Sequence, residues 1–123
     1  KRFITKSICY HAAYMANEIK AKAISTLTNS GYTAFQISAW RPSAHILVFT
    51  SNKRILTQLN LLWGVKSFYY AKSVSTDDTV TDVNEIARQK GFVEKGDFLI
   101  NLAAMPVTDK GMVNTLRVSE IEQ

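Results

Sequence analysis

The feature that most constrains the fold is an uninterrupted run at residues 45–50, His-Ile-Leu-Val-Phe-Thr. A strand with one face in water alternates apolar and polar residues, whereas successive apolar residues are typical of a strand covered on both faces. Further strands are expected at residues 23–27, 67–71 and 98–103, each bounded by polar or glycine-containing segments. These runs predict a buried and mostly parallel sheet.

Segments with helical spacing separate the strands. The first, residues 5–20, repeats apolar side chains every three or four positions, and further helices are expected at residues 32–40 and 53–61 and around Val80, Val83 and Ala87, ending at Lys90. This alternation predicts helices on both faces of the sheet, joined by right-handed crossovers. A fifth strand is expected at residues 112–118. The connection before it is too short for a parallel crossover, which needs about a dozen residues, so the last two strands should be antiparallel neighbours.

Composition indicates one ordinary globular domain over residues 1–123, with 46% hydrophobic and 20% charged residues. No apolar run approaches the roughly 18 residues of a membrane span, and no signal-peptide pattern opens the chain. A single cysteine excludes an internal disulfide, which favours a cytoplasmic location. The net charge of +5 is dispersed along the chain, which argues against nucleic-acid binding.

Residues that often carry chemistry have structural interpretations here. Cys9 falls in the apolar pattern of the first helix, and His11, two positions away, should face another direction. An acidic group at Asp77, Asp78 and Asp82 suits the start of a helix better than a metal site. The remaining candidates, Trp40, Trp63, Arg41 and His45, have no partners that suggest catalysis. We therefore expect no catalytic residue and no metal ligand in this chain.

The segment best suited to bind a ligand follows the first strand and consists of Thr28, Asn29, Ser30, Gly31, Tyr32 and Thr33. Ligands of open α/β sheets bind beyond the carboxyl ends of the strands, where helix N-termini attract anions. Glycine permits close backbone approach, and the three serine and threonine hydroxyls can donate hydrogen bonds to phosphate oxygens. An ordinary turn and helix cap would use the same residue types. The segment is neither a Walker loop nor a dinucleotide fingerprint, since it lacks the lysine of the first and two glycines of the second.

An ordered set of short motifs runs along the chain. It comprises A-K-A-I from Ala21, L-T-N-S-G-Y-T-A from Leu27, I-S and R-P at Ile37 and Arg41, a strand ending T-S-N at Asn52, L-L-W-G-V from Leu61, K-G-D from Lys95 and N-T-L-R-V from Asn114. In this order the set resembles the C-terminal regulatory domain of pyruvate kinases over essentially the whole chain.

That resemblance implies a three-layer α/β/α sandwich with a five-stranded mixed sheet in the order 3-2-1-4-5 and an antiparallel last strand. It implies a parent glycolytic enzyme that transfers phosphate from phosphoenolpyruvate to ADP with magnesium and potassium, all held by a barrel domain. This domain would need no cofactor. It would contribute to a homo-oligomer and to allosteric regulation, with a phosphorylated effector bound at residues 28–33.

Three departures from sugar-bisphosphate-regulated eukaryotic members bear on the effector. Asn29 stands where they tend to have lysine, no arginine occurs at residues 78–81, and their glycine-rich loop before the last strand is reduced here to residues 106–111. One phosphate pocket looks intact and the other lost. We expect a sugar monophosphate, a free anion or no effector, rather than fructose 1,6-bisphosphate.

Two other functions remain open. The first is a freestanding domain that binds small phosphorylated ligands. The second is a flavodoxin-like carrier of flavin mononucleotide, in which Trp63, Tyr69 and Tyr70 would flank the flavin ring. In all cases the final strand, residues 113–118, is expected at a sheet edge, which makes it the candidate subunit contact.

Overall fold

The computed structural model describes residues 2–71, 76–104 and 113–122. Its elements, in chain order, are α1 (Arg2–Ile19), β1 (Ala23–Leu27), α2 (Tyr32–Ala39), β2 (His45–Thr50), α3 (Lys53–Leu59), β3 (Val65–Tyr69), α4 (Thr76–Gln89), β4 (Phe98–Ala103) and β5 (Thr115–Glu120). Helices and strands alternate as far as β4, which the apolar runs and the helical spacing predicted.

The five strands form one sheet in the order β3-β2-β1-β4-β5. β1 lies at the centre, parallel to β2 and to β4, and β3 is parallel to β2. β5 is antiparallel to β4, with Ile100 opposite Val118. The expected sheet order and the antiparallel last strand are therefore confirmed.

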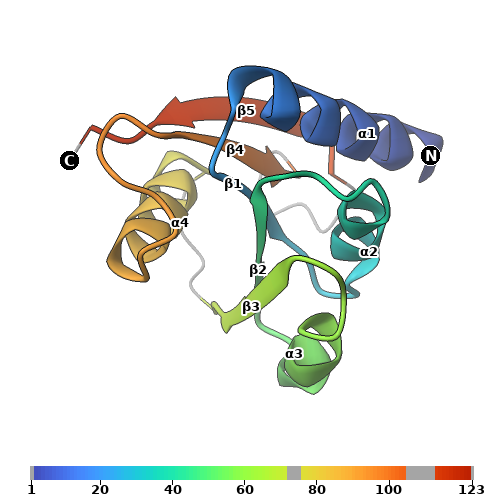
Figure 1. Ribbon diagram of the computed structural model, residues 1–123. Helices are drawn as coiled ribbons and strands as arrows, with labels where there is room; N and C mark the ends of the chain where they lie inside the picture. The colour runs from blue at the N-terminus through green and yellow to red at the C-terminus, as the bar shows by residue number, and fades with distance from the viewer. Residues whose placement is uncertain (1, 72–75, 105–112, 123) are drawn as a thin grey trace.

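Alternate residues of the central strands serve two separate cores. Ile46 and Val48 point to the side where α1, α2 and α3 pack, whereas Leu47 and Phe49 point to the side of α4. Figure 1 shows α1 and α2 on one side of the sheet and α4 on the other. Both faces of β2 and β4 are buried from their second residue onward, so their continuous apolar sequences follow from burial on both sides.

Two strands lie at different positions from those predicted. β3 spans Val65–Tyr69 instead of residues 67–71, because Val65 is buried in the core and pairs with Ile46. β5 spans Thr115–Glu120 instead of residues 112–118, since its pairing with β4 continues to Glu120 opposite Phe98. Two helix ends differ by similar amounts: α1 begins three residues earlier than expected, and α3 ends at Leu59 rather than at residue 61.

Within the described residues, no helix is both long and apolar enough to cross a membrane.

Candidate functional site

The candidate ligand loop, residues 28–33, leaves the carboxyl end of β1 and enters α2. Gly31 has φ +86° and immediately precedes α2, so the backbone turns there through the left-handed region that favours glycine. A Cβ at Gly31 would lie 3.0 Å from Leu59 Cδ2 on α3. Glycine is thus required both by the backbone angle and by the close approach of α3.

Two loop hydroxyls bond to amides of the same loop. The Gly31 N–H donates to Thr28 Oγ1 over 3.0 Å, and the Tyr32 N–H donates to Ser30 Oγ over 3.3 Å. Within α2, the first backbone bond runs from the Phe35 N–H to the Gly31 carbonyl. The N–H groups of Thr33 and Ala34 therefore have no acceptor inside the helix, as is general for a first helical turn. The Thr33 and Ala34 amides, with the hydroxyl hydrogens of Thr28 and Ser30, are the candidate donors to an anion in this loop.

Asn29 is held by the loop between β2 and α3. Its side-chain oxygen accepts from Ser51 Oγ at 3.3 Å, and its carbonyl accepts from Asn52 Nδ2 at 3.0 Å. Asn52 also caps α3, because its side-chain oxygen accepts from the Arg54 N–H at 3.1 Å. The contact with Asn29 was not foreseen.

Tyr32 and Thr33 are packed against α1, and their side chains are not available to a ligand at the surface of the loop. The Tyr32 ring lies 4.1 Å below the Arg2 guanidinium, and its hydroxyl is buried without a hydrogen-bond partner among the described residues. Thr33 is buried, and its carbonyl accepts from the Cys9 thiol. Of the six predicted residues, the accessible polar side chains are those of Thr28, Asn29 and Ser30, while Tyr32 and Thr33 offer backbone groups.

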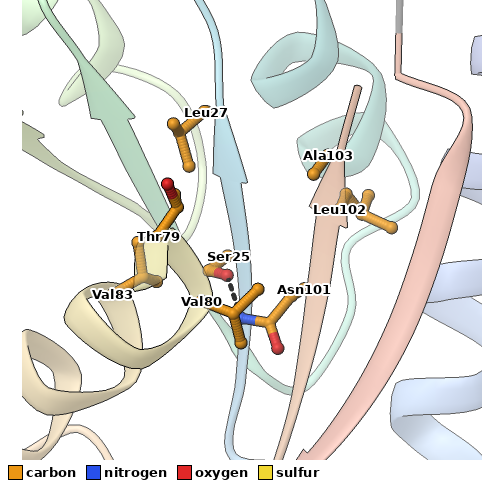
Figure 2. A pocket seen from close by; sticks show the side chains of 8 residues that line it. All are labelled: Ser25, Leu27, Thr79, Val80, Val83, Asn101, Leu102 and Ala103. Atoms are coloured by element: carbon orange, nitrogen blue, oxygen red, sulfur yellow. Dashed lines mark hydrogen bonds between the residues drawn. The ribbon is translucent and has the colours of Figure 1, made fainter. Parts of the chain in front are cut away.

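On the other face of the sheet, α4 covers the carboxyl end of β1. Its residues Val80 and Val83 face Leu27, the last residue of β1, across a small apolar recess (Figure 2). The recess is completed by Ser25, Thr79, Asn101, Leu102 and Ala103. Positions 78–81 read Asp-Thr-Val-Thr, so this part of α4 contributes no cation. The predicted loop at residues 106–111 lies outside the described residues.

Comparison with known proteins identifies the family. The family model for the pyruvate kinase alpha/beta domain matches residues 6–119. The chain belongs to this family. It is 33% identical to pyruvate kinase of Lactobacillus delbrueckii subsp. bulgaricus over 96% of its length and 35% identical to pyruvate kinase of Geobacillus stearothermophilus over 96%. It spans only about a fifth of each of these relatives, 20% in both cases.

A solved structure agrees with the sequence match. A crystal structure of a pyruvate kinase from Cryptosporidium parvum superposes with a TM-score of 0.84 at 25% identity, over 95% of this chain and 22% of that one. The resemblance noted in the sequence motifs is therefore confirmed, and the fold is that of the pyruvate kinase alpha/beta domain.

The flavodoxin-like alternative does not fit this pyruvate kinase fold. A flavodoxin sheet has the parallel order 2-1-3-4-5, whereas this sheet has the order 3-2-1-4-5 with β5 antiparallel. Trp63 precedes β3 and Tyr69 ends it, so the two rings lie at opposite ends of the strand. Tyr70 is buried, and its hydroxyl donates to Asp82 at 2.8 Å. The three rings do not flank one flavin site.

The other residues considered in the sequence have structural places in this pyruvate kinase domain. Cys9 is fully buried, which raises the pKa of its thiol to about 12, and His11 lies on the exposed side of α1. Trp40 and Trp63 are half-exposed and pack against Tyr10 and Arg41, respectively. His45 stacks edge-on against Phe92. In the part of the chain that the structure describes, no three His, Cys, Asp or Glu residues lie close enough to hold a metal ion.

One polar cluster was not predicted from the sequence. Asn101, in the middle of the apolar strand β4, bonds to side chains on three other elements. Its signal in the sequence was a lone amide within Phe-Leu-Ile-Asn-Leu-Ala, since a buried polar residue requires partners.

Proposed function

We propose that this chain is the regulatory and assembly domain of a pyruvate kinase, an enzyme that transfers phosphate from phosphoenolpyruvate to ADP. Membership in the alpha/beta domain family supports the proposal, together with relatives named pyruvate kinase that are about five times longer. In this arrangement the remaining four-fifths of the enzyme would hold the reacting groups, magnesium and potassium. This domain would hold none of them.

Within that role, residues 28–33 bind a phosphate group of an effector. The observation that carries this assignment is the left-handed turn at Gly31, which starts α2 directly after the hydroxyls of Thr28 and Ser30 at the carboxyl end of β1. A helix N-terminus attracts anions through its unpaired N–H groups and its dipole. Lys53 and Arg54, which begin α3 next to the Asn29 contact, add positive charge at the same end.

One phosphate rather than two is the expected ligand. Asn29 carries no charge and is occupied by the loop of Ser51 and Asn52. Thr79 and Val80, in the region of α4 where other family members would offer an arginine, are buried and uncharged. A second phosphate would therefore lack a cation from either position, which favours a sugar monophosphate or free phosphate over fructose 1,6-bisphosphate.

An amide NMR titration tests the site. Ribose 5-phosphate, fructose 1,6-bisphosphate and inorganic phosphate are added separately, and saturable shifts are expected at Ser30, Gly31 and Thr33. The double variant Thr28→Ala with Ser30→Ala should lose them. Ser43→Ala, an exposed hydroxyl before the amino end of β2, is the matched control and should retain them.

The titration separates the possible outcomes. Tight binding of the bisphosphate without measurable binding of the monophosphate would refute the one-phosphate assignment. An absence of shifts with every ligand would refute the effector site and leave an assembly role.

The edge strand β5 is the proposed subunit contact. It pairs with β4 on one side only, and Val118 is 45% exposed. Open strand edges offer unpaired backbone groups to a second strand. Sedimentation velocity should show self-association that Val118→Glu weakens and Thr57→Glu, on exposed α3 surface, leaves unchanged. A chain that stays monomeric at all concentrations would exclude this contact for the isolated domain.

A further inference from the structure

Asn101 connects elements on both sides of β4. Its side chain is 4% exposed, and its amide donates to Ser25 Oγ on β1 at 2.7 Å and to Asn84 Oδ1 on α4 at 3.1 Å. Its carbonyl oxygen accepts from Ser119 Oγ on β5 at 2.7 Å. Both amide hydrogens and the oxygen are therefore engaged, each with a different element.

These bonds depend on one another because they share a single planar group. If Asn84 no longer accepts its hydrogen bond, the Asn101 amide can rotate, which lengthens its bond with Ser119. Asn101 itself is buried, so leaving its amide unpaired is costly, while Asn84 and Ser119 are only partly buried. Asn84 and Ser119 are not hydrogen-bonded to each other, so any energetic dependence between them must pass through Asn101 or its immediate surroundings.

Part of the same cluster lies on β1, the strand that leads into the candidate ligand loop. Figure 2 shows Asn101 and Ser25 on neighbouring strands, with Val80 and Val83 of α4 beside them. The recess under α4 also contains Leu27, which is followed directly by Thr28 of the ligand loop. A displacement of α4 relative to β1 would act on this recess at one end and on the Asn84–Asn101 bond at the other.

We propose that Asn101 is a positioning residue that couples α4 to the edge strand β5. Through it, the position of α4 sets how firmly β5 is held on the sheet. In the proposed regulatory domain, and resting on that function, the coupling gives the end of the sheet that carries the effector loop a route to the subunit edge.

A double-mutant cycle without any ligand tests the coupling on the 123-residue chain. Asn84→Ala and Ser119→Ala are made singly and together, and unfolding in urea gives the equilibrium constant of each. Each single variant raises the unfolding constant by some factor. We expect the factor for the double variant to be about fivefold smaller than the product of the two single factors, as found for residues that share one network. Additive effects within about twofold would overturn the proposal, since that is the range of independent sites.

Two comparisons make the cycle specific to Asn101. Asn84→Ala combined with Ser67→Ala should be additive, because Ser67 lies on β3 and bonds to Leu56 and Asn60. In an Asn101→Leu background the Asn84–Ser119 coupling should disappear, and persistence of the coupling there would refute Asn101 as its carrier. Should Asn101→Leu not fold, hydrogen exchange supplies the test: Asn84→Ala should speed exchange of the β5 amides paired with β4 more than Ser67→Ala does, and equal rates would count against the proposal.

The NMR titration with phosphate tests the proposed effector site independently of the coupling through Asn101. If phosphate produces no shifts at residues 28–33 but the ligand-free cycle is coupled, the effector site fails and the coupling stands. If phosphate binds and the cycle is additive, the effector site stands and the coupling fails.

Discussion

Gly31 gives the sharpest test of how the candidate loop is built. Its replacement by alanine meets two separate costs, a left-handed backbone and a close contact. The left-handed conformation costs a non-glycine residue about 1–2 kcal/mol. The new Cβ would lie 3.0 Å from Leu59 Cδ2, and Leu59 is only 5% exposed, so its side chain must shift by a few tenths of an ångström among buried neighbours. Overpacking of this kind costs about 1–3 kcal/mol.

Gly91 is a matched control, because it separates the two costs. It has φ +83°, within a few degrees of Gly31, but a Cβ there would meet no atom within 4 Å. Gly91→Ala should therefore cost only the backbone part, about 1–2 kcal/mol. Gly31→Ala should cost about 3 kcal/mol in total, the sum of both parts.

Urea denaturation followed by circular dichroism measures the difference in the free energy of unfolding. Thermal unfolding should agree, since an unfolding entropy of about 2.1 cal/mol/K per residue makes 1 kcal/mol equal to about 4 °C in a chain of this length. Gly31→Ala should thus melt about 12 °C below the wild type and clearly below Gly91→Ala. Equal losses for the two variants would refute the steric argument at Leu59. No loss in either would refute the argument from the left-handed backbone.

Three further predictions concern single side chains. Burial, and then the hydrogen bond to Asp82, raise the pKa of Tyr70 from 10.0 to about 12. The stability it contributes is therefore complete below about pH 10 and lost as the pH rises to about 12. Tyr70→Phe should flatten the fall in the free energy of unfolding between these pH values, measured by urea denaturation. An unchanged fall would exclude Tyr70 as its source. Asn52→Ala should cost about 1–2 kcal/mol through loss of the α3 cap, whereas Asn52→Asp, which keeps the capping oxygen but not the donor to Asn29, should cost less by the same assay. Cys9, fully buried with a thiol pKa of about 12, should react with a disulfide reagent only as fast as the protein opens, so rapid labelling of the folded chain would contradict the burial of α1 on the sheet.

The centre of the sheet was predictable from sequence because burial on both faces leaves an unmistakable pattern. The run at β2 and the run at β4 are apolar at nearly every position, and the short connection before β5 leaves no length for a crossover. The edge strands were placed less well. β3 and β5 are only partly buried, so apolar pattern alone does not fix their bounds, which follow the backbone pairing with a neighbour, as with Glu120 opposite Phe98.

The candidate site was predictable as a segment but not as a set of contacts. Glycine before a helix at the end of a buried strand indicated residues 28–33, and the left-handed turn at Gly31 lies there. The tether from Asn52 to Asn29 joins residues 23 positions apart, and the bond from Asn101 to Ser25 joins residues 76 apart. Such pairs depend on how the parallel strands are aligned, which no local pattern encodes.

The contacts of the loop bear on how the proposed anion site would work with asparagine rather than lysine at position 29. Thr28 and Ser30 now act as acceptors for the Gly31 and Tyr32 amides, so their oxygens occupy the positions that phosphate oxygens would take at a helix N-terminus. An arriving anion can replace both acceptors at once, because each hydroxyl is free to rotate and donate to it instead. Two neutral hydrogen bonds would then become charge-assisted ones, which are roughly twice as strong. In the proposed site, binding would therefore need only a small rotation of the two hydroxyls, with Lys53 and Arg54 supplying positive charge from the start of α3.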